Sequence, residues 1–283
     1  MSVSIDPATR MGPVRLTVAD LDRARAFYAR ALGLSDLGAE GGIARMGPVG
    51  GPALVELEAR PDAPPRPRRS TGLFHLALLV PDRPELARAL RRVIEAGASF
   101  TGASDHLVSE ALYLDDPEGN GIEIYRDRPR EEWEHEGGEL RMATLPLDVE
   151  GVVGEMPPGP DDGMPDGTSM GHVHLQVRDI PEAEAFWSGV LGFEPTVRGY
   201  PGALFVSAGG YHHHLGLNTW GTAGAPAPPP GARGLGRAEI LVPEPRELDR
   251  VEARLADAGH PAGRGEEGLS ARDPSGNSFL VRV

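Results

Sequence analysis

The histidines of this chain gather in two stretches, and their type and spacing could support metal binding or acid–base chemistry. Seven of the nine histidines lie in residues 75–106 or 172–214, namely His75, His106, His172, His174, His212, His213 and His214. Imidazole is the commonest protein metal ligand and the side chain that titrates nearest to neutral pH. The remaining two, His135 in an acidic segment and His260 after a helix-ending glycine, are interpreted as surface residues.

An internal repeat supplies the elements that must position these histidines. Residues 12–34 match residues 171–193 without a gap, and residues 72–97 match residues 234–259 equally well. Each copy begins with an alternating, strand-like run and continues into a helix opened by Asp or Pro and closed by Gly. Three short strand candidates follow in each copy. The chain is therefore predicted to hold four βαβββ modules, at 12–60, 72–127, 170–220 and 234–283.

The repeat also predicts the domain organisation. The first two modules form an N-terminal domain, 10–127, and the last two form a C-terminal domain, 170–283. Residues 128–169 are polar and rich in Gly and Pro, which is typical of a linker between domains.

A short motif ends two of the four modules and differs between them by one acid. Residues 116–124 read DPEGNGIEI and residues 273–281 read DPSGNSFLV, so both open with Asp-Pro-x-Gly-Asn. Six residues after the Pro, the earlier copy carries Glu123, whereas the later copy carries Leu280. The module that ends at residue 127 therefore keeps a carboxylate that the last module lacks.

Composition excludes several classes of function. The net charge is −14 and the pI is near 5.1, which disfavours nucleic-acid binding because a basic surface would be required. The chain has no Cys, so thiolate metal sites are excluded, and it has no Lys, so a Schiff-base mechanism is excluded. Apolar runs such as residues 76–80 have the length of strands rather than membrane spans. We expect a cytoplasmic protein with no membrane partner.

The module order resembles the vicinal oxygen chelate superfamily, which includes glyoxalases, bleomycin-resistance proteins and extradiol dioxygenases. The resemblance implies an α+β fold in which two modules pair to form one cupped mixed sheet around a metal. Three stretches are more specific and are similar to catechol 2,3-dioxygenases: residues 104–133, 142–151 and 207–220.

The resemblance also implies where metal ligands sit. Family ligands come from the first strand of each module in a pair and from the last strand of the second module. The first-strand positions are Pro13, His75, His172 and Arg237, and the last-strand acid positions are Glu123 and Leu280. Pairing of consecutive modules would leave both ligand sets incomplete. Pairing of the second module with the third gives His75, His172 and Glu123, and leaves the other pair without ligands.

This ligand set indicates which metal the protein would use. Two imidazoles and one carboxylate, with positions left open, suit Fe(II), with Mn(II) as the alternative. Zinc usually completes a tetrahedron with a fourth ligand or water.

Three further residues match family positions for catalysis. The stretch FVSAGGYHH, residues 205–213, assigns the acid–base histidine to His213, although strand alternation would instead favour His214. Tyr113, four residues before Pro117, matches the substrate-binding tyrosine, and His106 matches a further histidine. His174 could replace His172 as a ligand, but His172 holds the family position.

These features predict an Fe(II)-dependent extradiol dioxygenase that cleaves catechol or a substituted catechol with O2, giving a 2-hydroxymuconic-semialdehyde type of product. Two alternatives stay open: a glyoxalase-like metal-dependent lyase or isomerase, and a metal-free, small-molecule-binding resistance protein. The first typically uses two acidic ligands, and the second does not require clustered histidines. Assembly into a homo-oligomer is open.

Overall fold

The computed structural model describes residues 3–283, and the chain folds as two compact units. Unit 1 holds residues up to Val14, Pro64–Phe74 and Gly171–Val283, and unit 2 holds Arg15–Ala63 and His75–Met170. Strands β1 (Arg10–Val18), β5 (Gly72–Leu79) and β12 (Ser169–Gln176) each contribute residues to both units. We keep the division into domains 10–127 and 170–283 as a proposal.

Unit 2 contains the first two modules, each with a helix and three further strands. In the first module these elements are α1 (Leu21–Arg30), β2 (Ser35–Glu40), β3 (Ile43–Gly47) and β4 (Val55–Ala59). In the second they are α2 (Arg83–Glu95), β6 (Phe100–Asp105), β7 (Ser109–Asp115) and β8 (Gly121–Asp127). Asp20 and Asp82 cap the two helices by accepting a backbone N–H from the first turn, as the sequence predicts.

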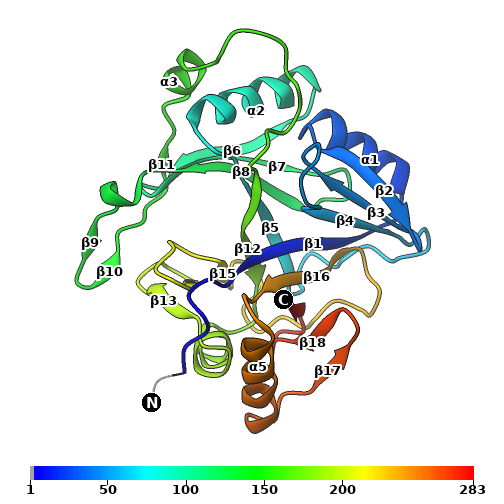
Figure 1. The fold of residues 1–283 in the computed structure, drawn as a ribbon, viewed down its shortest axis with the longest axis vertical. Helices are drawn as coiled ribbons and strands as arrows, with labels where there is room; N and C mark the ends of the chain where they lie inside the picture. Colours follow the sequence, from blue (N-terminus) through cyan, green and yellow to red (C-terminus); the bar gives the residue numbers. More distant parts are fainter. Residues whose placement is uncertain (1–2) are drawn as a thin grey trace. The chain divides into compact units, whose positions relative to one another are not determined.

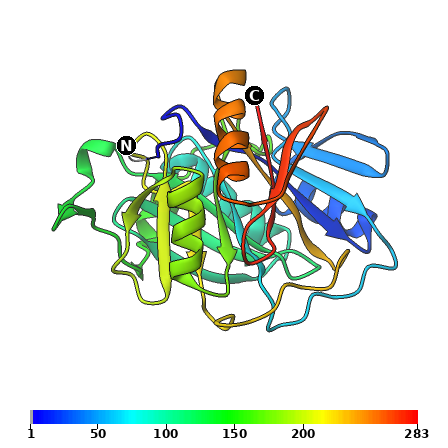
Figure 2. The ribbon, with the colours of Figure 1, turned by 90° about the horizontal axis from the view of Figure 1, so that it is seen from below.

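Unit 1 repeats this plan with the third and fourth modules. After β12 come α4 (Ile180–Glu184), the π-helical turn η2 (Ala185–Val190), β13 (Glu194–Val197), β14 (Ala203–Ser207) and β15 (Leu215–Asn218). The last module consists of β16 (Gly234–Leu241), α5 (Pro245–Asp257), β17 (Ala262–Gly265), β18 (Gly268–Arg272) and β19 (Ser278–Arg282). Helix α5 lies beside β17–β19 (Figures 1 and 2).

The strands form two large mixed sheets. In the second, third and fourth modules the first strand is parallel to the last, as in β5 with β8, β12 with β15 and β16 with β19, while hairpin neighbours such as β7 and β8 are antiparallel. One sheet has the order β11-β6-β7-β8-β5-β12-β15-β14-β13, and the other has the order β17-β18-β19-β16-β1-β4-β3-β2. The predicted α+β fold of βαβββ modules is therefore confirmed.

The segment 128–169 has structure of its own within unit 2. It contains η1 (Arg130–Glu132), the short hairpin β9 (His135–Glu136) and β10 (Glu139–Leu140), β11 (Leu145–Pro146) and α3 (Val149–Gly154). Helix α3 contacts α2, which covers one face of β6–β8 (Figure 1). The buried guanidinium of Arg92 on α2 donates to both carboxylate oxygens of Asp161, at 2.6 Å each, and to the Gly163 carbonyl. The segment is therefore held against α2 rather than acting as a free linker.

The Asp-Pro-x-Gly-Asn motifs are turns that begin the last strand of their modules. In each turn the buried Asp, Asp116 or Asp273, accepts the backbone N–H and the side-chain amide of the Asn four residues later. Burial raises the pKa of both carboxyls, to about 6 for Asp273. These turns place Glu123 and Leu280 at equivalent points of β8 and β19.

Among the described residues, no helix is both long and apolar enough to span a membrane.

Candidate functional site

His75 and Glu123 form a buried pair in unit 2. Their strands β5 and β8 are parallel neighbours, with His75 opposite Gly121 and Ala77 opposite Glu123. His75 Nε2 lies 2.9 Å from Glu123 Oε2, and the two residues are only 6% and 2% exposed. A carboxylate held at this depth requires a positive or hydrogen-bonding partner. The predicted imidazole and carboxylate ligands of the second module therefore do come together.

Tyr113 and His106 form a second pair in the same unit. Tyr113 on β7 is the cross-strand neighbour of Glu123, and its ring centroid lies 5.6 Å from that of His75. The Tyr113 hydroxyl is 2.6 Å from His106 Nε2, and His106 Nδ1 is 2.7 Å from the Ala143 carbonyl oxygen. All four predicted site residues of unit 2 thus lie on neighbouring strands or in the turn between them.

A buried apolar cluster adjoins this polar group. Ala77, Ala111 and Tyr125 are fully buried and pack against one another, with Leu79 and Tyr113 at their edge. The His75–Glu123 pair and Tyr113 therefore lie next to the apolar interior of unit 2.

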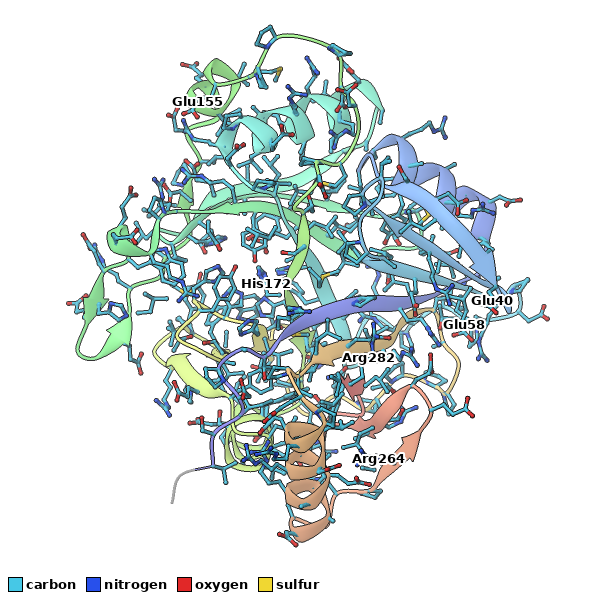
Figure 3. The ribbon with its side chains drawn as sticks, viewed as in Figure 1. Glu40, Glu58, Glu155, His172, Arg264 and Arg282 are labelled. Carbon is cyan, nitrogen blue, oxygen red and sulfur yellow. The ribbon has the colours of Figure 1, made fainter. Side chains whose placement is uncertain are left out.

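In unit 1, His172 lies among histidines. His172 on β12 is buried (Figure 3), and its ring centroid is 4.1 Å from that of His213 and 6.1 Å from that of His212. His212 Nδ1 and His213 Nδ1 are 2.8 Å apart, so one of these nitrogens carries a proton and the other accepts it.

His213, not His214, accompanies His172. The backbone N–H of Ala208 donates to His214 Nδ1, and the His214 ring lies beside Phe193. The expectation from strand alternation, which favoured His214, is wrong because residues 211–214 are irregular and β15 begins only at Leu215. Alternation of side chains holds for a pleated strand and does not extend into the turn before it.

The contact between His212 and His213 was not expected from the sequence. Adjacent residues on a strand point to opposite faces, so no pattern in the sequence could indicate that their rings meet. The run of three histidines was the only available signal, and it did not distinguish their orientations.

His174 belongs to an aromatic cluster in unit 1. Its ring packs against those of Phe74, Phe205 and Trp220, with centroids 5.2–5.7 Å apart. Gly216, its neighbour on β15, is required here because a Cβ at that position would lie 2.8 Å from the His174 ring. This environment fits the interpretation of His174 as a residue beside His172 rather than as a ligand.

The two surface histidines differ in their surroundings. His135 on β9 is exposed, whereas His260 is half-buried and its ring lies 4.8 Å from that of Phe186. His260 therefore packs on unit 1 and is less exposed than expected.

Comparisons with known proteins agree with this fold and site. The family model described as "Glyoxalase/Bleomycin resistance protein/Dioxygenase superfamily" matches residues 10–124 and 169–281. A catechol-2,3-dioxygenase of Bacillus subtilis (strain 168) is 43% identical over 284 residues, which cover 99% of each chain. The chain belongs to this superfamily. The predicted family is therefore confirmed.

Solved structures of the superfamily fold extend the likeness. Glyoxalase I from Zea mays superposes with a TM-score of 0.60 at 16% identity, covering 97% of this chain and 92% of that chain. The cppA protein from Streptococcus pneumoniae TIGR4 gives a TM-score of 0.56 at 13% identity, covering 99% and 98%. At these identities the likeness concerns the fold alone.

The fourth module has neither a histidine nor an acid at the positions equivalent to His75 and Glu123. Arg237 stands at the position of His75 and forms ion pairs with the buried Glu239 at 2.8 Å and with Glu267 at 2.7 Å. Burial alone would lower the pKa of Arg237. Its two acidic partners raise the pKa by more than burial lowers it, so the guanidinium stays charged. Leu280, at the position of Glu123, is buried. A permanently charged guanidinium has no lone pair to offer a metal.

Proposed function

We propose that this protein is an extradiol ring-cleaving dioxygenase that acts on catechol or a substituted catechol. The identity of 43% over the whole chain to a catechol-2,3-dioxygenase is the observation that carries the proposal. The buried His75–Glu123 pair, with Tyr113 and His106 beside it, supports the proposal independently of that identity.

Our proposal places one metal ion on His75, Glu123 and His172. Among the described residues, these three side chains form a group in which each offers one ligand atom, and together they could hold a metal ion. Two imidazoles and one carboxylate favour Fe(II), with Mn(II) as the alternative, and the absence of Cys removes the softer ligands that favour other metals. Glu123 and His75 are buried and already in contact, so both side chains are held in place before an ion binds.

A bound ferrous ion supplies Lewis acidity toward the catechol oxygens and a redox partner for O2. The chain itself supplies orientation. Tyr113 and His106, which hydrogen-bond to one another, orient an oxygen of the substrate.

His213 moves the protons in this proposal. It removes one from a substrate hydroxyl and later returns one to the ring-opened product. Its Nδ1 is engaged by His212 Nδ1, so Nε2 is the atom that exchanges the proton with the substrate. This hydrogen bond couples the two rings, because only one of the two Nδ1 atoms can carry the proton between them.

The direct test is oxygen uptake with catechol after anaerobic reconstitution with Fe(II), followed together with the yellow colour of the ring-opened product. The proposal predicts uptake of one O2 per catechol consumed and appearance of the coloured product. His260→Ala serves as the matched control, because His260 is a histidine that lies far from all the proposed ligands in the sequence. If the protein binds iron but takes up no oxygen with catechol or with any of several substituted catechols, the dioxygenase proposal is rejected. A glyoxalase-like reaction would then remain to be tested.

A further inference from the structure

Arg66, in the proline-rich connector between the first two modules, holds a half-buried positive charge within unit 1. Its guanidinium donates from Nη1 to the Leu73 carbonyl at 2.7 Å and from Nη2 to the side-chain oxygen of Gln176 at 2.9 Å. Both of these acceptors are uncharged. The buried Arg92, by contrast, is paired with the carboxylate of Asp161.

The charge of Arg66 is not compensated by an acid of the protein. Burial lowers the pKa of Arg66, and no carboxylate among residues 3–283 opposes that effect. An arginine nevertheless stays protonated at neutral pH. A half-buried charge costs free energy unless a counter-charge accompanies it. An anion supplied from outside the chain should therefore bind more strongly here than at a fully exposed arginine.

Hydrogen bonds within unit 1 fix the backbone of the connector that carries Arg66. The backbone N–H of Thr71 donates to the Pro226 carbonyl, and the backbone N–H of Arg233 donates to the Pro64 carbonyl. The two proline-rich connectors of the chain therefore run side by side (Figures 1 and 2). They are built into the fold and do not act as free spacers.

Gly72 makes room for the guanidinium. Its φ is 141°, and a Cβ at this position would lie 2.5 Å from Arg66 Nη1. A side chain at residue 72 would therefore displace Arg66 from its place beside Gln176. The connector thus holds the charged group in one position before any ligand binds.

Two exposed aromatic rings lie close to this charge. Phe74 follows the residue whose carbonyl accepts from Arg66, and the Gln176 side chain donates to the Trp220 carbonyl at 3.3 Å. The centroids of the Phe74 and Trp220 rings are 5.5 Å apart, and these residues are 38% and 37% exposed. Large apolar groups left exposed beside a fixed charge are typical of a ligand-binding surface.

Arg68 and Arg69 add positive charge to the same connector. Both are exposed, in a protein whose net charge is −14. Three arginines within four residues create a local positive potential that attracts anions toward Arg66.

We propose that Arg66 binds the carboxylate of an aromatic acid, with the ring of that acid against Phe74 and Trp220. This site does not depend on the proposed dioxygenase activity. Gln176 lies four residues along β12 from His172, which corresponds to about 13 Å in an extended strand. The carboxylate of the bound acid therefore does not reach the proposed metal ligands.

The first test measures ligand binding to the full-length wild-type protein by calorimetry at constant ionic strength. Benzoate should bind about 10-fold or more tightly than its neutral analogue benzamide, because only benzoate forms charged hydrogen bonds with a guanidinium. Inorganic phosphate, which has no ring, should bind about threefold or more weakly than benzoate. Equal affinities for benzoate and benzamide, or phosphate binding as tight as that of benzoate, would overturn the proposal.

The same titration with and without anaerobic Fe(II) separates this site from the proposed metal site. Benzoate affinity should change less than about twofold, because the carboxylate bound by Arg66 lies about 13 Å along β12 from His172. If benzoate binds only after Fe(II) is added, the carboxylate coordinates the ion and the Arg66 site is wrong. A protein that binds benzoate but cleaves no catechol would refute the proposed function and leave this site standing.

Three variants test whether Arg66 itself holds the carboxylate. Arg66→Gln should weaken benzoate binding by about 10-fold or more, and Arg66→Lys, which keeps the charge, should weaken it less. Arg68→Gln is the matched control, because it removes the same charge from an exposed neighbour and should change the affinity less than about twofold.

Equal losses in Arg66→Gln and Arg68→Gln would show that benzoate responds only to the general positive potential, which contradicts the proposal. Thermal unfolding of each variant checks that it is folded. If Arg66→Gln does not fold, Trp220→Ala replaces it and should weaken benzoate by about threefold or more without changing the affinity for phosphate. Unchanged benzoate affinity in Trp220→Ala would exclude the ring contact and overturn the proposal.

Discussion

At the scale of single residues, the irregular backbone before β15 decides which histidine lies beside His172. His213 lies against His172, whereas His214 accepts a backbone N–H and packs beside Phe193. Two adjacent histidines thus have different surroundings because a turn, not a strand, carries them.

His213→Ala should lower the turnover number by about 10²–10⁴-fold, the usual contribution of a general acid–base residue. Iron content should stay at the wild-type level, because His213 is not among the proposed ligands. His214→Ala is the matched control and should instead lower stability, by about 1–3 kcal/mol, because the Ala208 N–H would be left without its acceptor. Turnover and iron stoichiometry are measured on the same samples. Loss of iron in His213→Ala would move His213 into the ligand set.

At the scale of elements, the buried Asp of an Asp-Pro-x-Gly-Asn turn makes the stability of the folded protein depend on pH. Burial raises the pKa of Asp273 to about 6, above the ordinary aspartate value of 3.8, although Asn277 donates two hydrogen bonds to it. Below pH 3.8 both folded and unfolded chains hold the proton. Between 3.8 and 6 the unfolded chain releases it first, so this residue lowers stability as the pH rises through that window.

Asp273→Asn should remove this dependence. The difference in unfolding free energy between wild type and variant should shift by about 3 kcal/mol in favour of the variant as the pH rises from about 3 to about 7, with little further shift above that pH. Urea unfolding of both proteins at a series of pH values measures it. A difference that stays constant across this range would show that Asp273 ionises normally in the folded protein.

The ion pair between α2 and the segment 128–169 permits a second test at this scale. Arg92→Ala removes charged hydrogen bonds to Asp161 and should cost about 2–3 kcal/mol of stability. The segment should also become more sensitive to limited proteolysis, because its anchor on α2 is lost. Arg91→Ala, one residue away, is the control, since the ion pair of Arg91 is with Glu95 of the same helix, at 3.9 Å. Equal effects of the two substitutions would contradict the anchoring role of Arg92.

At the scale of the whole molecule, the proposed ligands are far apart in the sequence, because Glu123 lies about 50 residues after His75 and His172 about 50 residues after Glu123. A bound ion should therefore raise the unfolding temperature of the protein. At a metal concentration of 100 times the dissociation constant, the gain in stability should be about 2.7 kcal/mol.

Calorimetry with and without anaerobic Fe(II) measures this gain. The gain should vanish in Glu123→Gln and equally in His172→Ala. His135→Ala, which removes an exposed histidine, should retain it. If Fe(II) still stabilises His172→Ala as strongly as wild type, the ion is held by unit 2 alone and the three-ligand proposal is wrong.

The sequence by itself determined the repeated modules, the helix caps and the family of this protein. These features depend on local patterns, namely alternation, capping residues and turn motifs, that can be read within a few tens of residues. It also indicated that His75 and Glu123 belong together, because one module carries both on parallel neighbouring strands.

Only the tertiary structure decided the orientation of His213, the strand order of the two sheets and the contribution of Ala143. His213 points toward His172 because residues 211–214 leave the pleat, which no periodicity reveals. The Ala143 carbonyl reaches His106 through pairing of β11 with β6, a contact between segments about 40 residues apart. A backbone carbonyl is the same in every residue, so its role depends on where folding places it rather than on which amino acid bears it.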